Sequence, residues 1–223
     1  MKKQIKFTFI FTSLLIPCFL LGQLHQEVDL VNLYRKGKLK SVNREIEIAS
    51  GDRGAYLKIA ENKKDGIVWL PVKDFQNGAI EIELRGKDVF QRSFIGIVFH
   101  GIDAVSYDAV YCRPFNFSAR DSIRRIHAVQ YISHPDFTWE KLRKGRNAVF
   151  EKEIINPPGA GDWFTMKLVV DGKTVKVYIN NAAEPSLTVE KLNNRTSGKI
   201  GLFTADSSGG DFKTIKINYK KSY

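Results

Sequence analysis

The sequence of 223 residues has only two cysteines, Cys18 and Cys112, which excludes a disulfide-rich scaffold. Its seven prolines and seventeen glycines form no low-complexity stalk or collagen-like repeat. The four histidines lack the spacing with cysteines or acids that marks a metal site, and no phosphate-binding loop or dinucleotide fingerprint is present. What remains is a globular composition, with 43% hydrophobic, 12% aromatic and 26% charged residues.

The sequence also lacks an apolar run long enough to span a bilayer. Its longest run covers Phe7 to Leu21, about 15 residues, whereas a membrane-spanning helix needs roughly 20. Pro17 further weakens a helix in this run. Because three lysines precede the run and Gly22-Gln23 follow it, the pattern predicts a secretory signal peptide over residues 1–22.

A signal peptide implies export to the periplasm or the exterior, with no stable membrane span after cleavage. The alternatives are an uncleaved membrane anchor and a lipoprotein. Lipidation of Cys18 is disfavoured because the bulky residues Phe19-Leu20-Leu21 follow it. Without the leader, Cys112 would be the single cysteine, which excludes an intramolecular disulfide.

Basic residues outnumber acidic ones by 35 to 24, for a formal net charge of +11 that falls to +8 without the three leader lysines. Such a charge either attracts anionic polymers and membrane surfaces or simply solvates the surface. We favour solvation because the basic residues are scattered, with Arg124-Arg125 among the few knots. Nucleic acid is not expected as the partner of an exported protein.

Apolar and polar residues alternate in many segments, and Ile80 to Leu84 is one example. A period of two places the apolar set on one face, which predicts β-strands. The pattern recurs in residues 166–170, 175–179 and 215–219. Strand-like composition predicts further strands, about eleven in all, over residues 56–60, 66–70, 94–100, 107–112, 127–133, 149–155 and 199–204.

Turn signals separate these strands, and Asp171-Gly172 predicts the clearest hairpin. One short helix is expected over residues 136–144, with Asp136 as its cap and Gly145 as its stop. The sequence therefore predicts an all-β fold, a two-sheet antiparallel jelly-roll sandwich with at most one or two short helices. A closed barrel is the alternative. We expect a single domain over residues 23–223.

Three blocks of the sequence resemble a known family. They are residues 94–101 followed by 107–111, the Gly161-Asp162-Trp163 block leading to Asn180-Asn181, and residues 198–202 followed by 211–217. The pattern is similar to the concanavalin A-like sandwiches, in particular the 3-keto-disaccharide hydrolase domain family, over residues 65–219. The resemblance implies this fold and a sugar-related role.

The sequence departs from the family mainly at polar positions. Phe94-Ile95 stand where the family usually has Asn-Ser, Asp108 stands where it has Glu, and Phe164 replaces an Asn. Scaffold positions match better than positions that would carry chemistry, so the fold is transferred more readily than the activity.

Saccharide sites combine flat aromatic rings with planar hydrogen-bonding groups, and two segments between residues 107 and 143 are rich in both. The rings of Tyr111, Tyr131 and Trp139 are predicted to stack on a sugar. The hydrogen-bonding partners are predicted to be Arg113, Asn116, Gln130 and Arg143. The alternative interpretation is that these side chains only pack the sandwich.

Three functions follow, and the sequence leaves enzymatic activity open. The first is recognition of a carbohydrate on one aromatic-lined sheet face. The second is hydrolysis of a glycoside or a 3-keto-disaccharide, with Asp108 as the catalytic carboxylate. The third is a protein-interaction module. No cofactor is predicted; calcium at Asp206 and Asp211 around a glycine-rich turn is the alternative to a plain turn.

Overall fold

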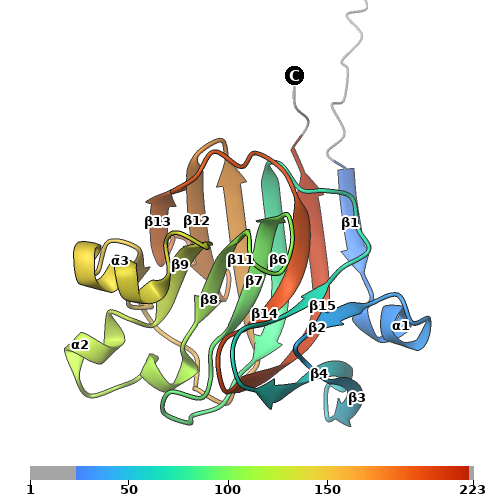
Figure 1. Cartoon of the computed structure of the whole chain (residues 1–223). Coiled ribbons are helices and arrows are strands. Elements are labelled where there is room, and N and C mark those ends of the chain that lie inside the picture. The colour runs from blue at the N-terminus through green and yellow to red at the C-terminus, as the bar shows by residue number, and fades with distance from the viewer. Residues whose placement is uncertain (1–23, 221–223) are drawn as a thin grey trace, which may run out of the picture.

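The computed structural model describes residues 24–220, so the leader predicted over residues 1–22 lies outside the described residues. Two antiparallel β-sheets pack face to face (Figure 1). This arrangement confirms the predicted all-β sandwich.

Sheet A has eight strands in the described part of the chain, and all its pairs are antiparallel. β1 (Leu24–Val28) pairs with the end of β15, which places Leu24 opposite Tyr219. The other strands follow in spatial order: β13 (Leu187–Glu190), β12 (Thr174–Ile179), β11 (Phe164–Asp171), β6 (Gly78–Arg85), β15 (Ser208–Tyr219), β4 (Gly54–Asn62) and β3 (Ile46–Gly51).

Sheet B has seven strands in the same described range, again all antiparallel. Their spatial order is β10 (Glu151–Lys152), β9 (Val129–His134), β8 (Tyr107–Cys112), β7 (Ile95–Gly101), β14 (Lys199–Thr204), β5 (Gly66–Trp69) and β2 (Lys40–Val42). The predicted hairpin at Asp171-Gly172 is confirmed, because β11 and β12 pair across it.

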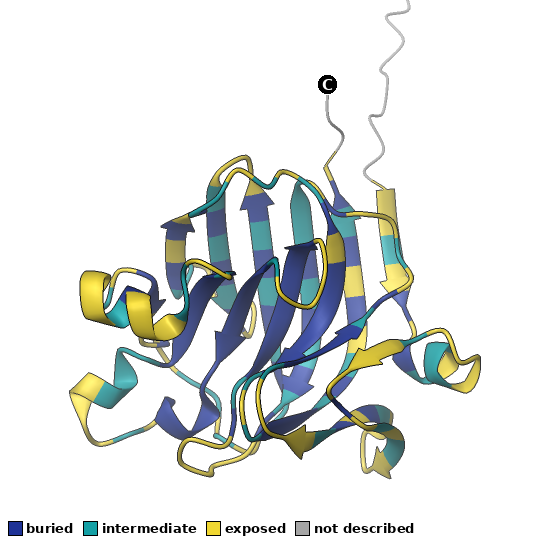
Figure 2. Cartoon of the chain, in the orientation of Figure 1, coloured by how far each residue is buried: buried dark blue, intermediate teal, exposed yellow. Residues whose placement is uncertain are grey.

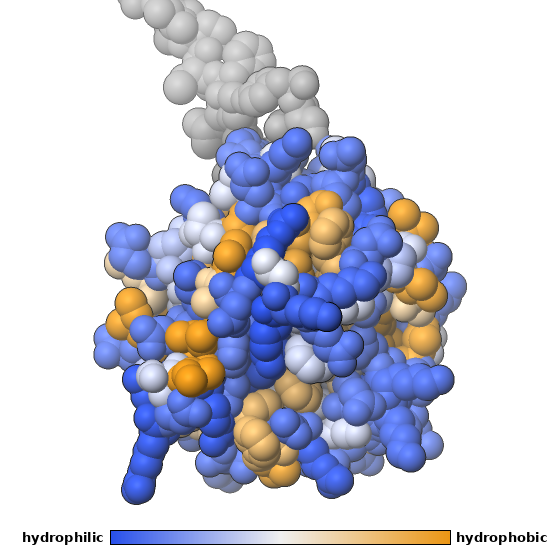
Figure 3. Space-filling model, turned by 60° about the vertical axis from the view of Figure 1, so that its left-hand side comes forward, coloured by the Kyte–Doolittle hydropathy of each residue, from blue (hydrophilic) through white to orange (hydrophobic). Residues whose placement is uncertain are grey.

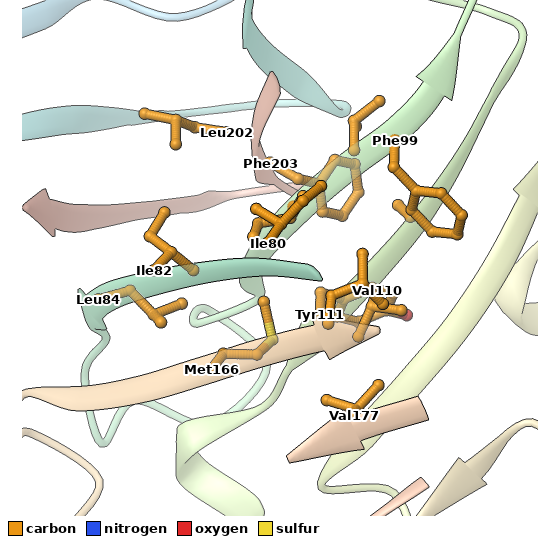
Figure 4. Close-up of a cluster of buried hydrophobic side chains, with 14 of the residues drawn as sticks. Ile80, Ile82, Leu84, Phe99, Val110, Tyr111, Met166, Val177, Leu202 and Phe203 are labelled. Atoms are coloured by element: carbon orange, nitrogen blue, oxygen red, sulfur yellow. The ribbon is translucent and has the colours of Figure 1, made fainter. Parts of the chain in front are cut away.

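The core lies between the two sheets. On sheet A, Ile80, Ile82 and Leu84 are fully buried, while the intervening residues of β6 are half-buried. A Cβ at Gly210 of β15 would meet Ile95 Cγ2, so Ile95 and the alternate residues after it on β7 face sheet A. Figure 4 shows this apolar cluster. Burial of such side chains drives the packing of the layers.

Sheet B is buried on its outer face as well. Every residue of β7 and β8 is buried, and Figure 2 shows these strands in dark blue. The rings of Tyr107 and Tyr111 lie with their centroids 6.0 and 5.5 Å from that of Phe203. Gly96 lies between Tyr111 and Phe203 in the register and has no side chain, so the two rings meet above it. The protein's own rings therefore fill this part of the outer face.

The described residues form three short α-helices, α1 (Leu30–Arg35), α2 (Ser122–Arg125) and α3 (Trp139–Arg146), and one 3₁₀ turn, η1 (Pro114–Asn116). The sequence predicts at most two short helices, so the structure has one α-helix more. The helix expected over residues 136–144 begins later, because Phe137 is hydrogen-bonded back to Ser133 and Thr138 provides the cap. None of the described helices is long and apolar enough to cross a bilayer.

Candidate functional site

Several of the predicted ligand-binding residues meet at the edge of sheet B beside α3. The register aligns Tyr111, Gln130 and Glu151 across β8, β9 and β10, so their side chains share the outer face. Arg113 follows β8 and turns back over them. Its Nη2 donates to Tyr111 Oη over 2.8 Å and to Gln130 Oε1. We call Tyr111, Arg113, His127, Gln130, Arg143 and Glu151 the arginine network.

Glu151 is the acceptor at the centre of the arginine network. Arg143 donates from Nε to Oε1 over 3.0 Å and from Nη2 to Oε2 over 2.8 Å. Arg113 Nη1 lies 3.5 Å from Oε2, and His127 Nδ1 lies 2.8 Å from it. A carboxylate shared by two guanidinium groups is held in place, and its oxygens are occupied by the protein's own donors.

Burial shifts the pKa values of the groups around Glu151. It lowers the pKa of Arg113, although the nearby Tyr111 and Glu151 oppose the shift. Burial also raises the pKa of Tyr111 to about 12. For His127, burial outweighs the attraction of Glu151 and lowers the pKa, so the ring is neutral at pH 7.

Gln130 leaves one donor of the arginine network open. Its Oε1 accepts from Tyr111 and Arg113, which fixes the orientation of the amide. Its Nε2 is buried, and no described residue accepts a hydrogen bond from it. An enclosed donor of this kind normally holds a water molecule.

The other predicted residues lie at different depths around the network. Asn116 is buried in η1 and accepts a hydrogen bond from Arg124 Nε over 3.2 Å. Trp139 begins α3 and is 43% exposed, with the Arg143 guanidinium 5.1 Å from its ring centroid. Trp139 is thus the predicted aromatic residue that a ligand can reach directly.

Asp108 and Tyr131 lie on the opposite, inner face of sheet B, as the period of two predicts for Asp108. Asp108 is fully buried, and its Oδ1 accepts hydrogen bonds of 2.6 Å from Tyr131 Oη and from Asn193 Nδ2. Arg195 Nε lies 3.3 Å from Oδ2. These bonds tie the crossover between β13 and β14 to sheet B.

The structure therefore does not bring all the predicted residues to one open face. Tyr111, Arg113, Gln130 and Arg143 belong to one network, Asn116 and Trp139 flank it, and Tyr131 lies inside the core with Asp108. The alternation of the strands predicts the faces, but it carries no information about what covers each face.

An open hollow lies elsewhere on the outer face, at the start of β8. Its volume is about 480 Å³, and we call it the rim pocket. It is lined by Asn43, Lys64, Asp65, Ala104, Val105, Tyr107 and His134.

Residues far apart in the sequence build the rim pocket. Tyr107 and His134 are register partners on β8 and β9, and their rings stack with centroids 4.8 Å apart and planes 7° apart. Tyr107 Oη donates to Asp65 Oδ2 over 3.0 Å. Asn43 Nδ2 donates to the backbone oxygens of Lys63 and Asp65, which fixes its side chain beside them.

The charges in the rim pocket are balanced at neutral pH. His134 Nε2 lies 4.0 Å from Asp65 Oδ2, and Lys64 supplies an exposed ammonium group. Burial lowers the pKa of His134, and this effect outweighs the attraction of Asp65. A neutral His134 offers a flat ring together with one hydrogen-bond donor and one acceptor.

Asn43 and Asp65 were missed in the sequence. Asn43 lies in the turn between the edge strands β2 and β3, and Asp65 lies in the turn between β4 and β5, where no alternation marks a face. They approach His134 only through the shape of the folded sheet, so no local signal could identify them.

The two residues considered for calcium have other partners. Asp206 Oδ1 accepts from the backbone N–H of Lys64, and Asp211 pairs with Arg85 over 2.7 Å. Among residues 24–220, no group of three or more histidine, cysteine, aspartate or glutamate side chains could hold a metal ion. Cys112 is buried, which raises the pKa of its thiol.

No protein-family model matches the sequence, and no curated protein matches it. Solved structures do match the fold. The carbohydrate-binding module CBM66 from Bacillus subtilis aligns with a TM-score of 0.56 and 14% identity, over 81% of this chain and 95% of that one.

Two further structures show the same architecture. A Bacillus licheniformis β-glucanase aligns with a TM-score of 0.52 and 13% identity, over 89% of this chain and 99% of that one. The exoplasmic/lumenal domain of VIP36, in its Ca²⁺/Man3GlcNAc-bound form, aligns with a TM-score of 0.50 and 9% identity, over 83% and 85%. These likenesses show that the fold is a concanavalin A-like sandwich.

Proposed function

We propose that the protein binds a saccharide and that the rim pocket is the binding site. The observation that carries this proposal is the ring of His134, stacked on the buried Tyr107, together with a carboxylate and an amide around one open hollow. Flat rings cover the apolar faces of sugars, while carboxylate and amide groups bind their hydroxyls. The leader predicted over residues 1–22 would deliver this binding protein to the periplasm or the exterior.

Proteins that share the fold support the same ligand class. One of the similar structures is a carbohydrate-binding module, and another was solved with Man3GlcNAc bound. The fold alone does not assign a ligand, so the proposal depends on the chemistry of the rim pocket.

The pocket favours binding over hydrolysis. Hydrolysis of a glycoside normally uses two carboxyl groups on either side of the bond, and Asp65 is the single carboxylate in the rim pocket. Asp108, the residue that the resemblance to 3-keto-disaccharide hydrolases points to, is sealed by Tyr131, Asn193 and Arg195. We therefore propose recognition without turnover.

Calorimetric titration against a panel of neutral mono- and oligosaccharides tests the proposal. Asp65→Asn and His134→Ala should each weaken binding of the best ligand at least tenfold, which corresponds to about 1.4 kcal/mol. Chromatography of the same mixtures should detect no cleavage product.

Trp139→Ala is the matched control, because Trp139 is an exposed aromatic outside the rim pocket. Its affinity should stay within twofold of the wild-type value. Loss of binding in Trp139→Ala with full binding in Asp65→Asn would move the site to α3. Absence of binding across the panel would contradict saccharide recognition altogether.

A further inference from the structure

Arginine is concentrated at one end of the molecule. Six of the twelve arginines fall within residues 113–146, and residues 113–152 hold nine lysines and arginines against four acids. This segment is therefore richer in basic residues than the rest of the chain. α2 lies within this segment, on the left in Figure 1.

The arginines of α2 are held in place by neutral groups. Arg124 donates to the side-chain oxygen of Asn116 over 3.2 Å and to the backbone oxygen of Phe115 over 2.8 Å. Arg125 donates to the backbone oxygens of Ala119 and Arg120. These bonds fix the positions of the two guanidinium groups, and within residues 24–220 no carboxylate is bonded to Arg124. Glu153 lies 3.7 Å from Arg125, and both of these side chains are exposed.

Exposed apolar side chains lie directly beside these cations. The Arg124 guanidinium is 4.6 Å from the ring centroid of Phe90, which is 58% exposed. Ile123 on α2 is 66% exposed, and Ile155, at 74%, lines a hollow of about 430 Å³ together with Arg125. Figure 3 brings this side of the molecule forward and shows apolar side chains among strongly hydrophilic ones.

We propose that this surface docks onto a bilayer that carries anionic headgroups. We call it the α2 surface and define it as Phe90, Arg120, Ile123, Arg124, Arg125 and Ile155. Guanidinium groups bind phosphates in a bidentate geometry, and the apolar side chains enter the boundary between headgroups and acyl chains. An acidic polysaccharide or a nucleic acid would satisfy the arginines but would leave Ile123 and Ile155 in water. The lipid surface is therefore the partner that uses both kinds of residue.

The α2 surface is separate from the rim pocket. Tyr107 of the rim pocket begins β8, whereas Arg113 and α2 follow the opposite end of the same strand. Docking at α2 therefore goes beyond the proposed saccharide binding, and each can be tested without the other.

Vesicle co-sedimentation tests the proposal. The protein, with its N-terminus identified by mass spectrometry, is mixed with vesicles of phosphatidylcholine alone or with about 30% phosphatidylglycerol. Partitioning should be at least about tenfold stronger on the anionic vesicles and should fall as salt is raised, because screening weakens the attraction. Equal partitioning onto both vesicles would overturn the proposal.

Variants separate the two contributions. In the double variant Arg124→Gln/Arg125→Gln, partitioning onto anionic vesicles should fall at least fivefold. The control Lys167→Gln/Lys176→Gln loses the same charge on the outer face of sheet A, and its partitioning should stay within twofold of the wild-type value. Ile123 is 66% exposed, so Ile123→Ser should retain the fold, and its partitioning onto anionic vesicles should also fall several-fold. Asp65→Asn should bind vesicles like the wild type.

A polygalacturonate arm distinguishes the competing partner. The contrary outcome is that the polymer binds with an affinity that falls in the arginine variant and is unchanged in Ile123→Ser, while vesicles bind weakly. In that case the surface recognises an acidic polymer and the lipid proposal is wrong. Binding to anionic vesicles that needs both the arginines and Ile123 supports it.

Discussion

At the scale of single residues, Glu151 balances the charges of the arginine network. It is buried, and it accepts hydrogen bonds from Nε and Nη2 of Arg143 while lying next to Arg113, which is itself almost fully buried. A buried ion pair adds little to stability over an apolar pair, but removing one partner is costly because the other charge stays buried. Glu151 is therefore needed for the fold at this edge of sheet B.

Glu151→Ala should lower the free energy of unfolding by about 3 kcal/mol or more, because it leaves Arg113 without a counter-ion. Urea denaturation followed by tryptophan fluorescence measures the change. Glu47→Ala removes an exposed partner of Lys58 and should leave the denaturation midpoint unchanged. Equal stability of the two variants would show that the network is solvated and not structural.

The residue types of the arginine network could be predicted, but not its role. Alternation along residues 107–113 places Tyr111 and Arg113 on one face and Asp108 on the other, and the structure agrees. Their burial depends on α3 and on the neighbouring strands, which lie far away in the sequence. The residues that indicate ligand binding in the sequence therefore form a packed, hydrogen-bonded edge of sheet B. Trp139 is the predicted aromatic residue that stays exposed.

At the scale of elements, Gly96 of β7 has no room for a side chain, whereas Gly145 of α3 has free space around it. A Cβ on Gly96 would lie 2.0 Å from the backbone oxygen of Val110 and 2.6 Å from Tyr111 Cα, so β8 itself blocks any larger residue. A Cβ on Gly145, in the exposed α3, would meet nothing within 4 Å.

Gly96→Ala should cost about 3 kcal/mol or more, because strand pairing cannot shift without breaking the ladder between β7 and β8. Gly145→Ala should stabilise the protein by up to about 1 kcal/mol, since alanine loses less backbone entropy in a helix. Thermal unfolding of the two variants gives the comparison. A fully stable Gly96→Ala variant would mean that β7 and β8 are further apart than described.

Long alternating strands were predictable, and short edge elements were not. β8 and β14 have the predicted bounds, because their apolar residues and flanking turns mark both ends. β2 has three exposed residues and no apolar alternation, and the alternation in β3 is limited to Ile46 and Ile48, which are only partly buried. Asn43 of the rim pocket lies between these two strands, which is why the pocket escaped prediction.

At the scale of the whole molecule, three histidines resist protonation. Burial is the largest cause of the lowered pKa of His100, His127 and His134, although Glu151 attracts a proton to His127 and Asp65 attracts one to His134. In the unfolded chain each would return to its ordinary pKa near 6.5. Between the two values the unfolded chain binds more protons than the folded one.

The free energy of unfolding should therefore fall as the pH is lowered from 7.5 to 5.5. Each histidine contributes a slope of at most about 1.4 kcal/mol per pH unit. Urea denaturation at several pH values gives the slope, and His100→Gln should flatten it, because glutamine does not titrate. Stability that rises on acidification would contradict the folded-state pKa shifts.

The pairing of β1 with the end of β15 determines the orientation in which the molecule can be immobilised. Leu24 and Tyr219 are cross-strand neighbours, so both ends of the described chain leave from one edge, at the top of Figure 1, while α2 lies low on the other side. A tether attached at Leu24 or at Lys220 would emerge from the same edge of the molecule. Copies immobilised through either of these two residues would thus present α2 outward.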